Sequence, residues 1–89
     1  MLLLLLKVQG HSMEPNFKAG SLVLISNLFF TPRINNVIVF KNSEKLILKR
    51  ITKVSGSKYQ VLGDNKLDSK DYGWIKRDEI LGRVILALK

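Results

Sequence analysis

Apolar positions along this chain gather in short runs, and turn-forming residues separate the runs. Six runs, rich in Val, Ile, Leu and aromatic residues, have the length of strands: Leu2–Val8, Leu22–Ser26, Val37–Phe40, Leu46–Val54, Tyr59–Leu62 and Val84–Leu88. Gly, Pro, Asn and Ser occupy the connections between them, as tight turns require. The only segment with helical character is Lys76–Ile80, long enough for one turn. We therefore predict a mainly β domain, built as a small, twisted, partly closed antiparallel sheet.

The run Leu46–Val54 contains a lysine in an apolar setting. Strand alternation places Lys49 on the same face as Ile47 and Ile51. If that face is covered, burial penalises the charged ammonium and lowers the pKa of Lys49 from the usual ~10.4. A lysine of this kind can act as a general base near neutral pH.

Length and composition limit the protein to a few classes. With 89 residues and 46% apolar content, we expect one domain over residues 1–89. The sequence has no cysteine and one histidine, His11. Disulfides, thiolate metal sites and a cysteine nucleophile are thus excluded, and we expect no metal and no cofactor.

The charge balance bears on partners. Fifteen Lys and Arg against seven Asp and Glu give a net charge of +8. The basic residues are dispersed and aromatics are few, so we expect no nucleic-acid binding. The apolar start, Met1–Leu6, is too short for a membrane span or a signal-peptide core. We expect a buried edge strand, with membrane-surface contact as the alternative, which leaves the location open between cytoplasm and membrane.

The segment Gly10–Pro15 follows a predicted strand and ends at a turn, which presents Ser12 on a loop at a sheet edge. A serine nucleophile needs a base, and the candidates are His11, a carboxylate or a desolvated lysine. The side chain of His11 should point away from that of its neighbour Ser12 in an extended segment. A serine paired with a lysine is a known form of nucleophilic site.

Several motifs together resemble the type I signal peptidase family. They occur in that family's order and span most of the chain: Ser12-Met13-Glu14-Pro15, Lys49-Arg50, Gly63-Asp64-Asn65, Ser69 and Asp71. The resemblance implies that Ser12 attacks the scissile carbonyl and that Lys49 accepts its proton. It also implies the signal-peptidase/LexA catalytic-core fold and a serine endopeptidase that removes an N-terminal leader or signal peptide.

The same resemblance suggests supporting roles for four residues. Ser69 would orient the Lys49 amine, and the segment containing Asp64 would brace the lysine. Asp71 and Arg50 would form a supporting charge pair.

The resemblance extends to substrate binding. An extended protein or peptide substrate would add to a strand edge, beside a shallow apolar pocket near Met13, Ile25 and Leu48. The Ser12 N–H would be the first oxyanion donor. Some relatives supply a serine hydroxyl two residues before the nucleophile, where this chain has Gly10. In size the chain is similar to the compact soluble proteases that mature nickel-type superoxide dismutase.

Two other functions remain open. A self-cleaving regulatory domain of the LexA type shares the Ser/Lys dyad, but it should carry a DNA-binding region and a cleavage linker before the nucleophile, where this sequence has eleven residues. An inactive β-module that binds peptides is the third interpretation, since the segment after Ser69 is shorter than in signal peptidases.

Overall fold

A computed structural model describes residues 3–27, 31–67 and 71–88. Within these ranges the chain forms seven strands and one short 3-10 helix, η1: β1 (Leu3–Lys7), β2 (Leu22–Ser26), β3 (Val37–Asn42), β4 (Lys45–Ser55), β5 (Lys58–Leu62), β6 (Trp74–Lys76), η1 (Arg77–Glu79) and β7 (Ile80–Leu88). All six predicted strands are present. The sequence pattern missed β6, which has only three residues, and it made β7 four residues too short at its start.

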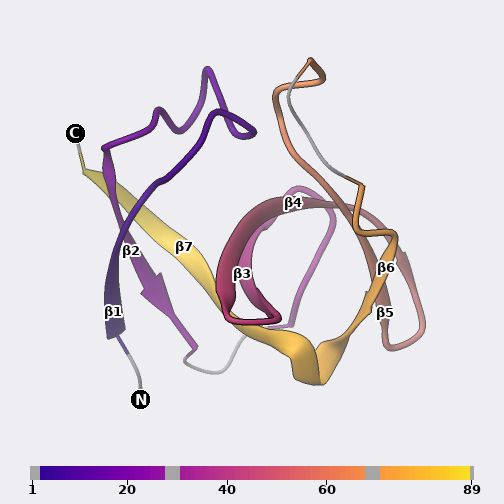
Figure 1. The fold of residues 1–89 in the computed structure, drawn as a ribbon. Helices are drawn as coiled ribbons and strands as arrows, with labels where there is room; N and C mark the ends of the chain where they lie inside the picture. The colour runs from indigo at the N-terminus through magenta and orange to yellow at the C-terminus, as the bar shows by residue number, and fades with distance from the viewer. Residues whose placement is uncertain (1–2, 28–30, 68–70, 89) are drawn as a thin grey trace.

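The strands form one antiparallel sheet in the order β1-β2-β7-β3-β4-β5-β6. The sheet is strongly curved, so that β3 to β6 wrap around one side while β1, β2 and the end of β7 extend to the other (Figure 1). The prediction of a mainly β, antiparallel fold is confirmed.

Strand β3 separates two apolar clusters, because its side chains are buried on both faces. Ile38 and Phe40 point into the first cluster, which fills the curve of β3 to β7. Val39 points into the second cluster, which packs Val8, Val23 and Ile25 beneath the β1–β2 hairpin. Strand β4 contributes to both clusters by the alternation read from the sequence. The loop segments that approach β3 and β4 are therefore placed over a well-packed base.

The opposite face of β1, β2 and β7 is apolar but uncovered by the described residues. Its rows are in register, with Leu5 beside Leu24 and Leu86 in one row. Leu5 and Leu86 remain 54% and 52% exposed. No helix in the described ranges is both long and apolar enough to span a membrane.

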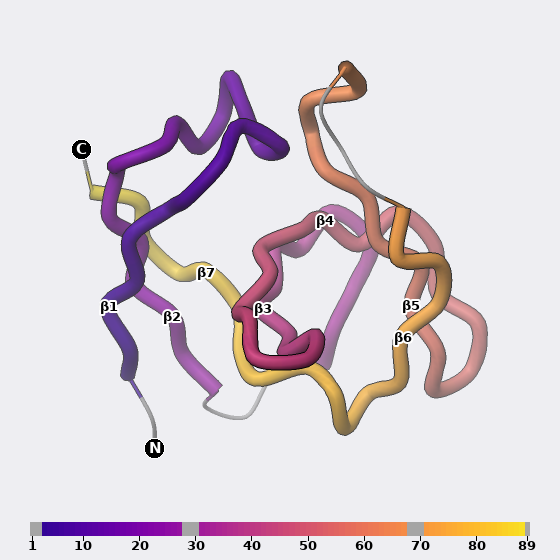
Figure 2. The backbone as a smooth tube through the Cα atoms, in the orientation of Figure 1, coloured from indigo at the N-terminus to yellow at the C-terminus, as the bar shows by residue number. Residues whose placement is uncertain are grey.

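Two loops lie on the same side of the molecule, at the top of Figure 2. The first loop joins β1 to β2 and is closed at its base by Val8, which donates to the Ser21 carbonyl and accepts from the Gly20 N–H, both at 2.8 Å. The second follows β5 and contains Gly63, Asp64 and Asn65. Hydrogen bonds between these loops build the candidate site.

Candidate active site

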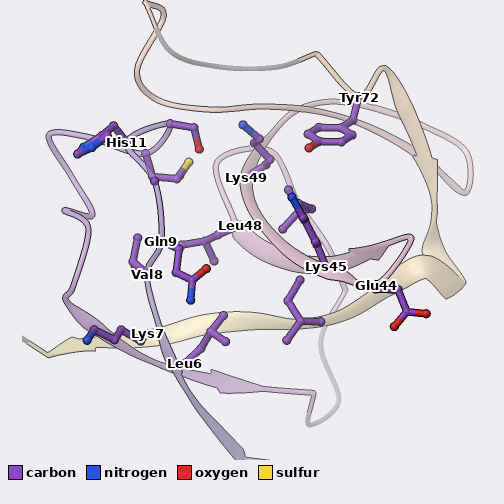
Figure 3. Close-up of a pocket in the computed structure, with 15 residues that line it drawn as sticks. Leu6, Lys7, Val8, Gln9, His11, Glu44, Lys45, Leu48, Lys49 and Tyr72 are labelled. Atoms are coloured by element: carbon purple, nitrogen blue, oxygen red, sulfur yellow. The ribbon is translucent and has the colours of Figure 1, made fainter.

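A cavity of about 610 Å³ lies between the β1–β2 loop and the β3–β4 hairpin (Figure 3). Two stretches of chain and one aromatic residue line it: Leu6–Met13, Glu44–Lys49 and Tyr72. The volume is within the range of ligand-binding pockets. Ser12 and Lys49, the predicted nucleophile and base, both lie in its wall.

Lys49 is buried, with 3% of its surface exposed. Its position on the inward face of β4, next to the core residue Ile51, follows from the strand alternation. The Lys49 Nζ lies 5.6 Å from the centre of the Tyr72 ring, and that ring packs edge-on against Phe40. Burial favours the neutral amine, whereas the ring face favours the ammonium. The expected burial of Lys49 is confirmed.

Met13 anchors the loop that carries Ser12. Its side chain is 2% exposed, and its carbonyl accepts the Phe17 N–H at 2.9 Å. Gly10 has a φ of +75°, in the left-handed region that favours glycine. A serine at that position would be strained, which gives a physical reason for the glycine there.

Asp64 connects the Ser12 loop to the strand that carries Lys49. Arg50, the residue after Lys49, donates from Nε and Nη2 to the two Asp64 carboxylate oxygens, each at 2.8 Å. Asn16 of the Ser12 loop donates to Asp64 Oδ2, also at 2.8 Å. These donors, above all the Arg50 guanidinium, hold the pKa of Asp64 below its usual value, and the Asp64 carboxylate in turn raises the pKa of Arg50. One carboxylate thus links both sides of the site.

The predicted charge pair between Arg50 and Asp71 is not formed in the structure. Arg50 is bonded to Asp64, while Asp71 accepts the Gly73 N–H at 2.7 Å within its own turn. Asp64 lies near Arg50 because β5, which leads into the turn containing Asp64, pairs with β4 at Arg50. Asp71 belongs to the later segment that leads into β6.

Asn65 forms the direct contacts with the backbone at Ser12. Its N–H donates to the Ser12 carbonyl at 2.7 Å, and its side-chain Nδ2 donates to the His11 carbonyl at 2.9 Å. Its Oδ1 accepts the Leu67 N–H at 3.1 Å, which orients the amide. The Gly63-Asp64-Asn65 segment therefore braces the nucleophile loop itself.

The imidazole of His11 lies 2.9 Å from Glu14, from Nδ1 to Oε2. This side-chain pair is on the surface of the loop, with His11 61% exposed, and it lowers the pKa of Glu14. His11 and Lys49 thus both line the cavity with Ser12, His11 with an exposed imidazole and Lys49 with a buried amine.

The remaining predicted residues are placed as follows. Met13 and Leu48 line the cavity. Ile25 does not line it, because its side chain is buried in the second apolar cluster. Ser69 lies outside the described residues.

One residue of the site, Tyr72, and one residue outside the cavity, Asn16, were not singled out from the sequence. Tyr72 lines the cavity beside Lys49, and Asn16 bonds to Asp64. An aromatic residue next to the predicted Asp71, and an amide immediately after the Ser12–Pro15 motif, were the available signals. Neither signal predicts a role by itself, because the role depends on the fold, which places Tyr72 beside Lys49 and Asn16 beside Asp64.

A family model described as Peptidase S24-like matches residues 2–85. The match covers nearly the whole chain and includes both Ser12 and Lys49. The chain belongs to the Peptidase S24-like family. It is therefore a domain of the serine-peptidase type, a class that includes self-cleaving domains of the LexA kind. A search of curated proteins found no match.

The S24-like assignment fits the chemistry of the cavity. The described residues contain no cluster of three or more His, Cys, Asp or Glu arranged to hold a metal ion. The groups that line the cavity include Ser12, the buried Lys49 and the polar backbone of the Ser12 loop. This set is suited to acyl transfer by nucleophilic and general base catalysis.

Proposed function

We propose that this domain is an endopeptidase with a Ser12/Lys49 dyad, which removes an N-terminal leader or signal peptide from a protein substrate. The observation that carries the proposal is the burial of Lys49 in the wall of the same cavity as Ser12. An ordinary strand lysine at a sheet edge is exposed to water and protonated. A lysine enclosed between a serine loop and an apolar core is suited to the neutral state that a base requires.

The mechanism uses the two side chains in turn. Lys49 Nζ takes the Ser12 proton as Oγ attacks the scissile carbonyl, and the resulting ammonium then gives this proton to the leaving amine. An acyl-enzyme remains on Ser12. Lys49 next takes a proton from water, which attacks the ester, and the proton returns to Ser12 Oγ as the acid is released. The Ser12 N–H stabilises the oxyanion in both halves.

The cavity suits an extended chain. Strand β1 is the last strand of the sheet, and its continuation, Lys7–Gly10, forms one wall. The opposite wall is the start of β4, where β5 is not yet paired, because the β4–β5 ladder begins at Arg50. A peptide placed between these two edges gains main-chain hydrogen bonds from both sides. Leu48 and Met13 then border its side chains near the dyad.

The test is cleavage of a panel of leader-type peptides with small residues before the scissile bond, across pH. The intact protein is compared with Ser12→Ala and Lys49→Ala. We expect loss of cleavage in both variants, and a wild-type rate that rises with pH as Lys49 loses its proton. Cleavage that persists in both variants overturns the dyad.

Self-cleavage is distinguished by the mass of the protein itself. If the domain acts on its own chain, incubation at alkaline pH should shorten the wild-type protein, independently of its concentration, and leave Ser12→Ala intact. An intact wild-type chain that cleaves added peptides supports the leader peptidase. Peptide binding without cleavage in either form identifies an inactive β-module.

We propose further that the apolar outer face of β1, β2 and β7 contacts an anionic membrane surface. Its exposed residues are leucines in adjoining strands, and the protein carries a net charge of +8. Flotation with anionic vesicles should carry the wild type, and Leu5→Asn should lose this binding. Val54→Asn, at a 42% exposed position on β4, is the control. Equal flotation of all three proteins, or none, contradicts the contact.

A further inference from the structure

We infer that Asn65 is a positioning residue for the oxyanion hole, an inference that rests on the proposed Ser12 peptidase. The relevant group is the peptide unit between His11 and Ser12. Its carbonyl belongs to His11, and its N–H is the oxyanion donor on Ser12. Any contact that fixes the orientation of this peptide unit also fixes the direction in which the Ser12 N–H points.

In a trans peptide the C=O and the N–H point in opposite directions. The His11 carbonyl accepts two hydrogen bonds, from Asn65 Nδ2 at 2.9 Å and from the Glu14 N–H at 3.2 Å. The shorter bond directs the carbonyl toward the Gly63–Asn65 turn. The Ser12 N–H must therefore point away from that turn, which does not line the cavity, whereas His11, Ser12 and Met13 do.

No backbone carbonyl of the described residues accepts a hydrogen bond from the Ser12 N–H. Backbone N–H groups in folded proteins are almost all paired, so a donor held in a fixed direction at a cavity wall is available to a ligand. The next peptide unit is held as well, because the Asn65 N–H donates to the Ser12 carbonyl at 2.7 Å. Asn65 thus fixes the units on both sides of the Ser12 α-carbon.

The amide of Asn65 is itself oriented. Its Oδ1 accepts the Leu67 N–H at 3.1 Å, which leaves Nδ2 as the atom that faces His11. An aspartate in this position keeps the shape and the Leu67 contact, but it turns the donor to the His11 carbonyl into an acceptor. The peptide unit would then lose its fixed orientation, and with it the preorganised donor on which oxyanion stabilisation depends.

The experiment compares Asn65→Asp and Asn65→Ala with the wild type and with Asn16→Ala as the matched control. Asn16 donates a hydrogen bond of similar length within the same network, but to Asp64 and not to the backbone at Ser12. The readouts are kcat and KM for one cleaved peptide, and the affinities for a peptide boronate and for the uncleavable reduced-amide form of that peptide.

We expect both Asn65 variants to lower kcat roughly 10- to 100-fold with KM nearly unchanged, somewhat less than complete removal of an oxyanion donor. Boronate affinity should fall in parallel, because the boronate is tetrahedral and negatively charged like the intermediate. Affinity for the reduced-amide peptide should stay within about twofold. Asn16→Ala should leave the ratio of the two affinities as in the wild type.

Equal losses of boronate and reduced-amide affinity, or a loss of kcat that Asn16→Ala reproduces, overturn the positioning role. These outcomes differ from a failure of the proposed function. In that case the wild type itself would show no cleavage that depends on Ser12.

Discussion

At one end of the cavity the Gly63–Asn65 turn ties the Ser12 loop to β4 through charged and backbone hydrogen bonds of 2.7 to 2.9 Å. At the other end, Glu44 and Lys45 are exposed on the β3–β4 hairpin. Glu44 points away from the cavity in Figure 3. We infer that the hydrogen-bonded end holds the catalytic groups in a fixed geometry, whereas the exposed end can adapt to different substrates.

The largest effect on cleavage is expected from removing the proposed base, Lys49, at the hydrogen-bonded end of the cavity. Lys49→Met keeps the volume of the side chain but deletes its amine, so we expect cleavage to fall roughly 10³- to 10⁴-fold. Stability should be unchanged or higher, because methionine carries no desolvation penalty at a buried position. Cleavage assays and urea denaturation measure both quantities. A destabilised Lys49→Met would show that the amine is needed for folding.

The second change removes the charge that joins the two sides of the site. Asp64→Asn loses the ionic acceptor for Arg50, and we expect unfolding free energy to fall by about 2 kcal/mol. The control is Asp78→Asn on the exposed η1 helix, which should stay within about 0.5 kcal/mol. Urea denaturation at neutral pH tests the pair of variants.

The contribution of Asp64 should depend on pH in one direction. Its folded pKa is lowered, so its stabilising effect is full above the unfolded value, about 3.9, and is lost as the pH falls through the folded pKa. The stability gap between the wild type and Asp64→Asn should therefore close on acidification below about pH 4. A gap that persists at low pH would rule out the ion pair as its source.

A smaller effect is expected from the ring beside Lys49. Tyr72→Leu removes a π face that favours the ammonium, whereas Tyr72→Phe keeps it. The rise of cleavage rate with pH should move to lower pH in Tyr72→Leu by a few tenths of a unit, and stay in place in Tyr72→Phe. Rate profiles measured from pH 5 to 10 check this. A shift shared by both variants would point to the hydroxyl.

The smallest effect is expected at the open end. Lys45→Glu should leave stability within about 0.5 kcal/mol. It should change the relative cleavage rates for acidic and basic peptides a few-fold, because the substitution replaces a positive charge in the cavity wall with a negative one. Lys41→Glu, at an exposed position on β3 outside the cavity, is the control for net charge. Identical effects of the two variants would mean that only overall charge matters.

The strands and the buried face of Lys49 could be predicted because alternation is a local property of the sequence. Leu22–Ser26 was predicted to the residue, and Ile47, Lys49 and Ile51 share a face as expected. The three-residue β6 escaped because it is too short to show a period.

The partners of the site residues were harder to predict, because they depend on which turns meet in space. The Arg50 pair was assigned to Asp71, but the β4–β5 ladder brings Asp64 to Arg50. Ile25 was placed near the substrate, yet its alternation on β2 directs it into the core. The sequence motifs identified these residues, but their spacing did not predict which residues they contact.

The most direct test of the Ser12/Lys49 dyad is intact-protein mass spectrometry of a cleavage reaction quenched with acid within the first turnover. The account predicts a transient mass increase on the wild type, equal to the acyl group of the substrate's amino-terminal fragment and located on Ser12. Ser12→Ala should show neither this adduct nor cleavage. An adduct on another residue, or cleavage by Ser12→Ala at the wild-type rate, would contradict the account.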